Sequence, residues 1–350
     1  MKDWSNCKRI LLVRLDNMGD VIMNNPAFAQ LKLNLPHARI TLLTSSVASA
    51  IVPYLGTIDE TIVFDSPWMK NSTKTEAPSS VHNIINILKQ KKFDACILFN
   101  VYSQNILPAA FLCYLAEIPI RAAYCRENPY HLLTHWIPDP EPLQIIHHQI
   151  DRDRLLLKHL GFREQEFSGS YLISTSNDTL EISLINEYVL LNFDVSEEKR
   201  QIPLEMAIKI LVKLQEDILP VALIGQKNSA YFDALRRYID ENSCIDLVGK
   251  TSLEELLVLT QNAKAVISVN TSVVHIACAF NTPVLALYAD TNPQHLPWSA
   301  KSNYYVFPIP PSQKSKNEII KYVDRTFKLE STELDIDKIW DMYQALLWNI

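Results

Sequence analysis

The chain has 350 residues, 48% of them hydrophobic, and a formal net charge of -6. This length exceeds the roughly 250 residues at which a single core stops growing, so we expect two domains. The acidic balance disfavours nucleic-acid binding, which needs a broad positive surface. Apolar runs such as Ala265–Val269 are far shorter than the roughly 20 residues that span a bilayer, and the charged N-terminus disfavours a signal peptide, so we expect a cytoplasmic protein.

Short apolar runs alternate with amphipathic stretches from the start of the chain, as in a parallel sheet flanked by helices. The predicted strands are Arg9–Leu15, Ala38–Thr44, Thr61–Phe64, Asp94–Asn100 and Ile120–Tyr124. The predicted helices are Pro26–Leu35, Val81–Lys92 and Gln104–Glu117. A Pro-rich passage, Pro129–Pro142, interrupts this pattern, and a helix over His148–Leu160 then leads to a second series.

The second series repeats the alternation. Its predicted strands are Tyr188–Phe193, Val221–Gly225, Ile245–Val248, Ala265–Val269, Pro283–Tyr288 and Tyr304–Phe307. Its predicted helices are Pro203–Glu216, Ala230–Glu241, Leu253–Gln261 and Val273–Phe280, with a last helix within Ser331–Ile350. Two α/β domains in tandem bind ligands beyond the carboxyl ends of their strands, so we expect the site in a cleft between them.

The first candidate residue for chemistry is Asp20, in the turn that follows the opening strand. We expect Gly19, after Met18, to allow a tight turn with positive φ. A single positioned carboxylate is enough to take the proton of an attacking hydroxyl, so Asp20 can serve as a general base. The alternative is that Asp20 only caps the helix that follows.

A second candidate site lies where the strand Ala265–Val269 gives way to Asn270, Thr271 and Ser272 and a helix that carries His275. A helix N-terminus offers backbone N–H groups and partial positive charge, which suit a diphosphate. Ordinary helix capping by these small polar residues is the alternative.

A third candidate is the loop from Leu191 to Arg200, where Lys199 or Arg200 can neutralise phosphate oxygens. The alternative is a solvated loop. Other patterns are weaker: Asp151-Arg152-Asp153 runs into a helix and is interpreted as its solvated face, not as a metal site. The six cysteines lack CxxC spacing and are expected to be reduced core residues.

Together these segments resemble glycosyltransferase family 9, the ADP-heptose:lipopolysaccharide heptosyltransferases and their relatives. The opening strand, its Gly-Asp turn and the following Pro26-Ala27 are similar to the start of the family, which implies that Asp20 is the catalytic base. The segment from Val266 to His275 resembles the family's Asp-Thr-Gly-x-x-His signature, with Asn270 in place of Asp and Ser272 in place of Gly. Thr271 and His275 keep the signature, and Lys199 falls where the donor-phosphate lysine is expected.

The resemblance implies a GT-B architecture, with two Rossmann-like domains facing an interdomain cleft. We expect an acceptor-binding domain over residues 1–165, a nucleotide-sugar domain over 166–330, and a C-terminal helix, 331–350, that packs back on the first domain. Donor binding is assigned to Ser196, Lys199, Asn270, Thr271, Ser272 and His275, and Met18 and Gly19 shape the turn beside Asp20.

The implied activity is an inverting, metal-independent transfer from a nucleotide-diphosphate sugar, an ADP-sugar by resemblance, with no other cofactor. The acceptor is a glycan, a lipid-linked oligosaccharide or a small molecule, and any membrane association is peripheral. Because Asn270 and Ser272 depart from the signature, two alternatives stay open: a catalytically silent nucleotide- or glycan-binding scaffold, and a sugar-nucleotide epimerase of the same architecture.

Overall fold

The computed structural model describes residues 4–69, 78–164, 171–172, 187–226 and 229–348. The chain divides into two compact units, residues 1–171 and 172–350, so the division lies shortly after the predicted boundary at 165. Each unit contains a sheet of six described strands, and every described strand pair is parallel. Within the described ranges, no helix combines the length and the apolar character needed to cross a membrane.

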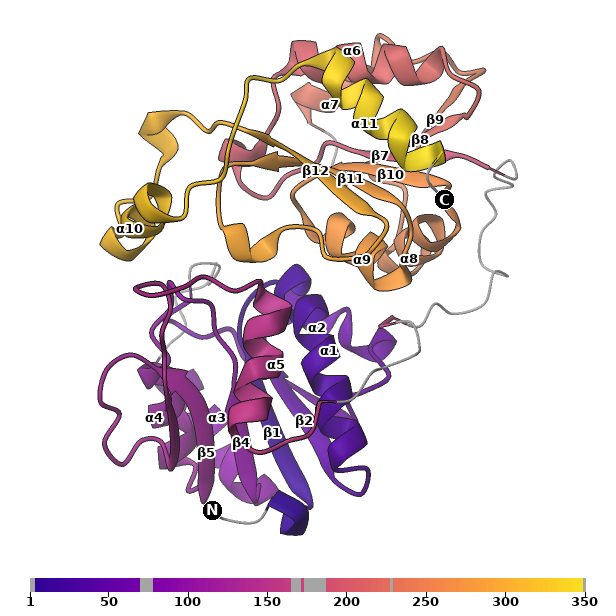
Figure 1. Ribbon diagram of the computed structural model, residues 1–350. Helices are drawn as coiled ribbons and strands as arrows, with labels where there is room; N and C mark the ends of the chain where they lie inside the picture. Colours follow the sequence, from indigo (N-terminus) through magenta and orange to yellow (C-terminus); the bar gives the residue numbers. More distant parts are fainter. Residues whose placement is uncertain (1–3, 70–77, 165–170, 173–186, 227–228, 349–350) are drawn as a thin grey trace. The chain divides into compact units, whose positions relative to one another are not determined.

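The first sheet has the strand order β3-β2-β1-β4-β5-β6. Its strands are β1 (Arg9–Arg14), β2 (Arg39–Thr44), β3 (Glu60–Val63), β4 (Ala95–Leu98), β5 (Ile120–Cys125) and β6 (His135–Pro138). Its helices are α1 (Met18–Asn34), α2 (Ser46–Ser49), α3 (Pro78–Lys91), α4 (Leu107–Leu115) and α5 (Gln149–His159). Helices α1 and α5 lie side by side (Figure 1), while α3 and α4 close an apolar core on the other face of the sheet.

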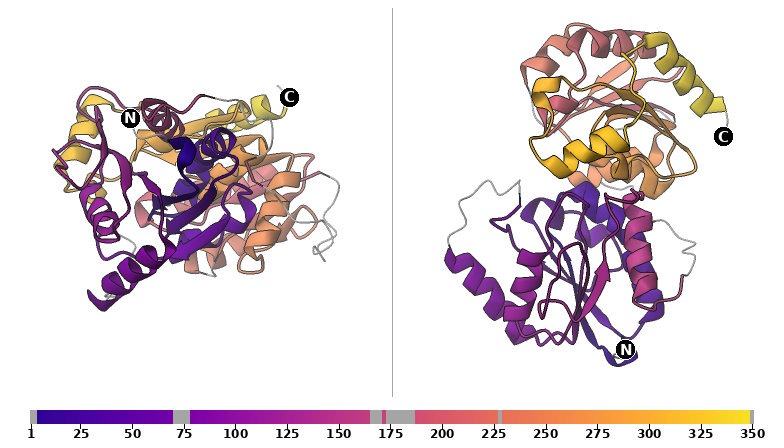
Figure 2. Two further views of the ribbon diagram at one scale, coloured as in Figure 1. Left: turned by 90° about the horizontal axis from the view of Figure 1, so that it is seen from below. Right: turned by 60° about the vertical axis from the view of Figure 1, so that its left-hand side comes forward.

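The second sheet has the order β12-β11-β10-β7-β8-β9. Its strands are β7 (Val189–Asn192), β8 (Val221–Ile224), β9 (Cys244–Asp246), β10 (Ala265–Val269), β11 (Val284–Ala289) and β12 (Ser302–Phe307). Its helices are α6 (Leu204–Gln215), α7 (Ala230–Arg236), α8 (Leu253–Asn262), α9 (Ser272–Phe280), α10 (Glu318–Thr326) and α11 (Ile336–Trp348). Figure 2 gives two further views of these layers, in which α6, α7 and α11 cover one face and α8 and α9 the other.

Both sheets reverse their strand order once. In the first sheet, β1 lies between β2 and β4, with Leu11 opposite both Thr41 and Cys96. In the second sheet, β10 lies between β11 and β7, with Ile267 opposite both Leu285 and Leu191. In open α/β sheets, ligands bind at the carboxyl ends of the two strands where the order reverses. Two places are therefore candidate ligand sites: the carboxyl ends of β1 and β4, named the β1/β4 edge, and the carboxyl ends of β7 and β10, named the β7/β10 edge.

Three features differ from the sequence prediction. Helix α1 begins at Met18 and carries Pro26 in its interior, whereas a helix beginning at Pro26 was predicted. Gly19 therefore lies inside the helix and is not among the glycines with positive φ. The Pro-rich passage contains strand β6, which pairs only with β5 among the described strands; an edge strand tolerates proline because one side of it needs no ladder hydrogen bonds.

The prediction for the C-terminal helix was also wrong. Ile339 and Tyr343 of α11 are buried in the core of the second unit, against strands β10, β11 and β12 and helix α6. Lys213 of α6 pairs with Asp337 at 2.9 Å and lies over the Trp340 ring. The helix thus covers apolar surface of the sheet nearest to it in sequence. The six cysteines are buried and free, as predicted.

Candidate functional site

A buried arginine organises the β1/β4 edge of the first unit. Arg14, the last residue of β1, is fully buried and lies between two carboxylates. Its Nε is 2.8 Å from an oxygen of Asp16, and its Nη2 donates to Asp20 Oδ1 at 2.9 Å. Asp20 also accepts the backbone N–H of Asn17 at 3.2 Å. Asn17 is therefore the N-cap of α1, and Asp20, three residues inside the helix, accepts the N-cap N–H in a capping box; the Asp20 side chain at the same time keeps 12% exposure.

Charge at this edge is concentrated within a few residues. Burial raises the pKa of Asp16 to about 6, against the lowering effect of Arg14, and the neighbouring charge of Asp20 adds to the rise. Burial by itself would lower the pKa of Arg14, but the charges of Asp16 and Asp20 outweigh it and leave that pKa raised. Two carboxylates share one guanidinium, so each is a weaker partner for it than either would be alone.

A pocket opens beside Asp16 where β1 and β4 part. Gln104, from the loop after β4, donates a hydrogen bond to Asp16. The described lining of this pocket combines an aromatic and thioether wall with amides and one carboxylate: Trp68, Met69, Phe99, Asn100, Gln104, Asn105 and Asp16. With a cavity volume of about 20 Å³, this pocket has room for one hydroxyl group or water and not for a whole sugar ring.

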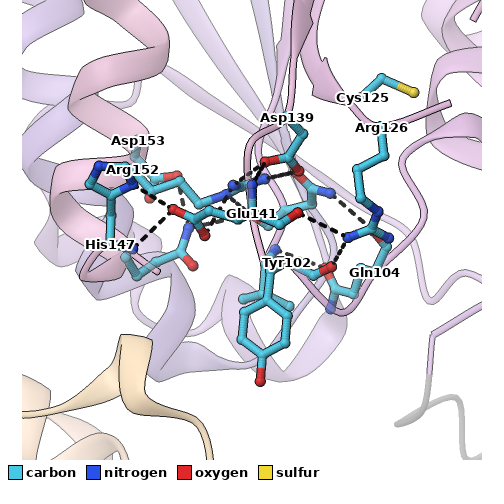
Figure 3. Close-up of polar contacts among 12 residues, drawn as sticks. Tyr102, Gln104, Cys125, Arg126, Asp139, Glu141, His147, Arg152 and Asp153 are labelled. Atoms are coloured by element: carbon cyan, nitrogen blue, oxygen red, sulfur yellow. Dashed lines mark hydrogen bonds and ion pairs between the residues drawn. The ribbon is translucent and has the colours of Figure 1, made fainter. Parts of the chain in front are cut away.

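A buried ionic network holds the loops of this edge in place (Figure 3). Arg152 of α5 binds both oxygens of Asp139 at 2.8 Å and lies 3.2 Å from Glu141. The Arg152 Nε also donates to the Asn100 backbone carbonyl at 3.1 Å, and His147 contacts Glu141 at 2.8 Å. The loops after β4 and β6 are thereby tied to α5.

This network corrects one prediction. Arg152 and Asp153 are 1% and 2% exposed, so the Asp151-Arg152-Asp153 stretch is not a solvated helix face; only Asp151 is exposed. Burial raises the pKa of Asp153 to about 7, although both Arg14 and Arg152 lower it. The burial of Arg152 and Asp153 could not be predicted from the helical pattern, because that pattern identifies buried positions by apolar residues and these two are charged.

Small polar side chains organise the β7/β10 edge of the second unit. Asn192, at the end of β7, donates to Ser268 Oγ at 2.9 Å and to Thr271 Oγ1 at 3.1 Å. Asn270 accepts the Ala289 backbone N–H at 3.2 Å and donates to Thr291 Oγ1 at 3.2 Å. The two asparagines therefore fix the ends of β7, β10 and β11 to one another without placing any charge there.

Helix α9 begins directly beyond these contacts. Thr271 is its N-cap, and Ser272 is its first residue; both side chains are partly exposed. The N–H groups of a first helical turn have no partner within the helix, so this turn can bind an anion. His275 lies one turn further on, is 7% exposed, and its ring packs edge-on against His295 at 6.5 Å. His275 thus contacts the turn after β11.

The cations of this edge come from the loop after β7. Lys199 and Arg200 lie in the short helix η4 (Glu198–Arg200), and Ser196 is exposed just before it. Arg200 donates through Nη1 to the Asn270 backbone carbonyl at 3.1 Å, which brings it to the turn before α9. Of the two adjacent cations, the predicted donor residue was Lys199, whereas Arg200 is the one that contacts the turn before α9.

Arg14, Asp16 and Glu197 were missed as site residues. A charged residue at the end of an apolar strand was the available signal for Arg14, since burial of such a residue requires a charged partner nearby. Asp16 lies only four positions before Asp20, and Glu197 lies two positions before Lys199. Nothing in the sequence alone showed that Asp16 and Asp20 share the cation Arg14. Nor did it show that Glu197 pairs with two cations.

Comparison with known proteins finds similar sequences and similar structures. Residues 81–323 match the family described as glycosyltransferase family 9 (heptosyltransferase). The lipooligosaccharide heptosyltransferase 2 of Haemophilus influenzae is 23% identical over 82% of this chain and 85% of its own length. A glycosyl transferase family 9 structure from Veillonella parvula is 18% identical, covers 98% of each chain and has a TM-score of 0.72.

A third similar protein is the structure of Escherichia coli ADP-heptose lps heptosyltransferase II. It is 18% identical, with 97% of this chain and 99% of that chain covered and a TM-score of 0.71. At these identities the two structures establish the fold, and they confirm the predicted GT-B class.

Proposed function

The chain belongs to glycosyltransferase family 9, and from that premise we propose that this glycosyltransferase moves a heptose-like sugar from an ADP-sugar to an acceptor hydroxyl with inversion. The names of its relatives support both the nucleotide and the sugar, since they include an ADP-heptose lps heptosyltransferase. The acceptor is a glycan or lipid-linked oligosaccharide of the lipopolysaccharide type, reached from the cytoplasmic side by at most peripheral contact with a membrane.

The observation that carries this proposal is the exposed edge of the Asp20 carboxylate, held by Arg14 at the β1/β4 strand ends. In our proposal Asp20 takes the proton of the acceptor hydroxyl as that oxygen bonds to the anomeric carbon. The bond from this carbon to the diphosphate oxygen breaks on the opposite face, which inverts the configuration.

The leaving diphosphate gains charge in this step, and we assign its stabilisation to the β7/β10 edge. Lys199 and Arg200 supply positive charge, and Thr271 and Ser272 supply the start of α9. Asn270 and His275 support the turn that presents these groups, because both contact the residues that follow β11. These cations and N–H groups make a divalent metal unnecessary in the proposed mechanism.

A transfer assay with purified protein tests the proposal. A panel of nucleotide sugars that includes ADP-heptose is supplied with a lipopolysaccharide-core acceptor, with and without a metal chelator, and the product is examined by NMR. We expect transfer from ADP-heptose, an inverted anomeric configuration and no loss with chelator. Donor binding without any transfer supports the scaffold alternative, and epimerised donor without acceptor supports the epimerase.

A further inference from the structure

One carboxylate in the second unit holds both cations of the β7/β10 edge. Lys199 Nζ lies 3.2 Å from Glu197 Oε2, and Arg200 Nη2 lies 3.0 Å from Glu197 Oε1. The two oxygens of Glu197 thus face two different cations. All three side chains remain between 26% and 28% exposed, so solvent and ligands reach them.

This arrangement resembles the way a diphosphate would be bound. A nucleoside diphosphate presents several anionic oxygens to cations that lie side by side, and Glu197 presents two. With Glu197 in place, the three side chains carry a net charge of only about +1, because the carboxylate offsets one of the two cations. A diphosphate and Glu197 therefore compete for the side-chain N–H groups of Lys199 and Arg200.

The two cations are anchored differently. Arg200 also donates to the Asn270 carbonyl at 3.1 Å, so it stays at the turn before α9 when its contact with Glu197 is lost. Lys199 forms its ion pair with Glu197. Exchange of Glu197 for a diphosphate thus requires movement of two partly exposed side chains, Glu197 and Lys199.

We propose that Glu197 is an internal counter-ion that the donor diphosphate displaces, and that its return to Lys199 and Arg200 assists release of the nucleoside diphosphate product. This inference rests on the proposed donor site. Glu197 then lowers donor affinity in exchange for faster product release, and it is a residue that tunes affinity without itself contacting the sugar.

The test is ADP binding measured by calorimetry on the full chain. The neighbouring Glu198 is a matched control, because it is exposed and carries the same charge, while the ion pairs of the cations are with Glu197. We expect Glu197→Gln to bind ADP about three- to tenfold more tightly at low salt, with Glu198→Gln within about twofold of wild type. The gain should shrink at high salt, because salt screens exposed ion pairs.

The possible results of this binding experiment distinguish the counter-ion from its alternatives. Tighter binding confined to Glu197→Gln supports the counter-ion, whereas equal or weaker binding relative to Glu198→Gln overturns it and makes Glu197 a support for the cations. ADP binding in none of the three proteins, with cooperative thermal unfolding in all, contradicts the donor site itself and the counter-ion with it.

Discussion

The β1/β4 edge and the β7/β10 edge have the same topology and opposite chemistry. Each lies where the strand order of a parallel sheet reverses, and each begins with a polar residue at a strand end. At the first edge that residue is Arg14, which is buried and holds the carboxylates Asp16 and Asp20. At the second edge it is Asn192, which holds the hydroxyls of Ser268 and Thr271.

In the proposed mechanism, this difference assigns the two parts of the group transfer to two different edges. Carboxylates at the first edge can accept a proton from a hydroxyl, while neutral amides at the second edge leave room for an anion beside two cations. The fold supplies the position of each edge, and two or three side chains at the strand ends decide its charge.

Removing the central residue of each edge should therefore have unequal effects on stability. Arg14→Met leaves the carboxylates of Asp16 and Asp20 partly buried without their cation, so we expect a loss of about 3–5 kcal/mol in unfolding free energy, measured in urea. Arg39→Met is the control, since Arg39 is exposed on the neighbouring strand, and it should change stability by less than about 1 kcal/mol. Equal effects of the two changes would contradict the role of Arg14.

The matching change at the second edge should be milder. Asn192→Ala removes hydrogen bonds to two hydroxyls but leaves no charge buried, so we expect a loss of about 1–3 kcal/mol in urea. A loss as large as that of Arg14→Met would show that the two edges do not differ in the way proposed here.

A charge removed from the second edge should affect donor binding. Lys199→Gln takes away a phosphate partner, so we expect ADP to bind about tenfold more weakly by calorimetry. Lys209→Gln, on the exposed side of α6, is the control and should leave ADP binding unchanged. Comparable weakening in both variants would indicate a general charge effect and would remove Lys199 from the site.

A smaller effect is expected from the pH dependence of transfer. The pKa of Asp16 is about 6, so Asp16 becomes protonated as the pH falls through 6. Arg14 then pairs with Asp20 alone, which makes Asp20 a weaker base, and the transfer rate should fall about two- to tenfold below pH 6. In Asp16→Asn this step near pH 6 should be absent, with a rate at pH 8 close to the wild-type rate at low pH; an unchanged profile would contradict the coupling.

The strand pattern was predictable because buried parallel strands appear as continuous apolar runs, and all but one of the first sheet's strands were identified in that way. Strand β6 was missed because Pro138 at its end and the prolines of the surrounding segment suggest an interruption, which an edge strand tolerates. The start of α1 was missed because Gly19 and Pro26 both suggest that a helix has not yet begun.

The site was predictable only in part. Asp20, Lys199 and the turn from Asn270 to Ser272 follow predicted strands, and their positions at the strand ends could be inferred from topology. The partners of these residues could not be inferred. Arg14 lies near Asp153 of α5, more than a hundred residues away in sequence, and Asn270 contacts the turn after β11.

The central claim, that the two edges divide proton transfer from donor binding, is tested most directly by the variant Asp20→Asn. It keeps the size of the side chain and removes its capacity as a base, so we expect the rate of sugar transfer to fall by a factor of about 10²–10⁴. ADP binding, measured by calorimetry on the same preparation, should stay within about twofold of wild type. Transfer at the wild-type rate in this variant, or loss of ADP binding together with transfer, would contradict the account.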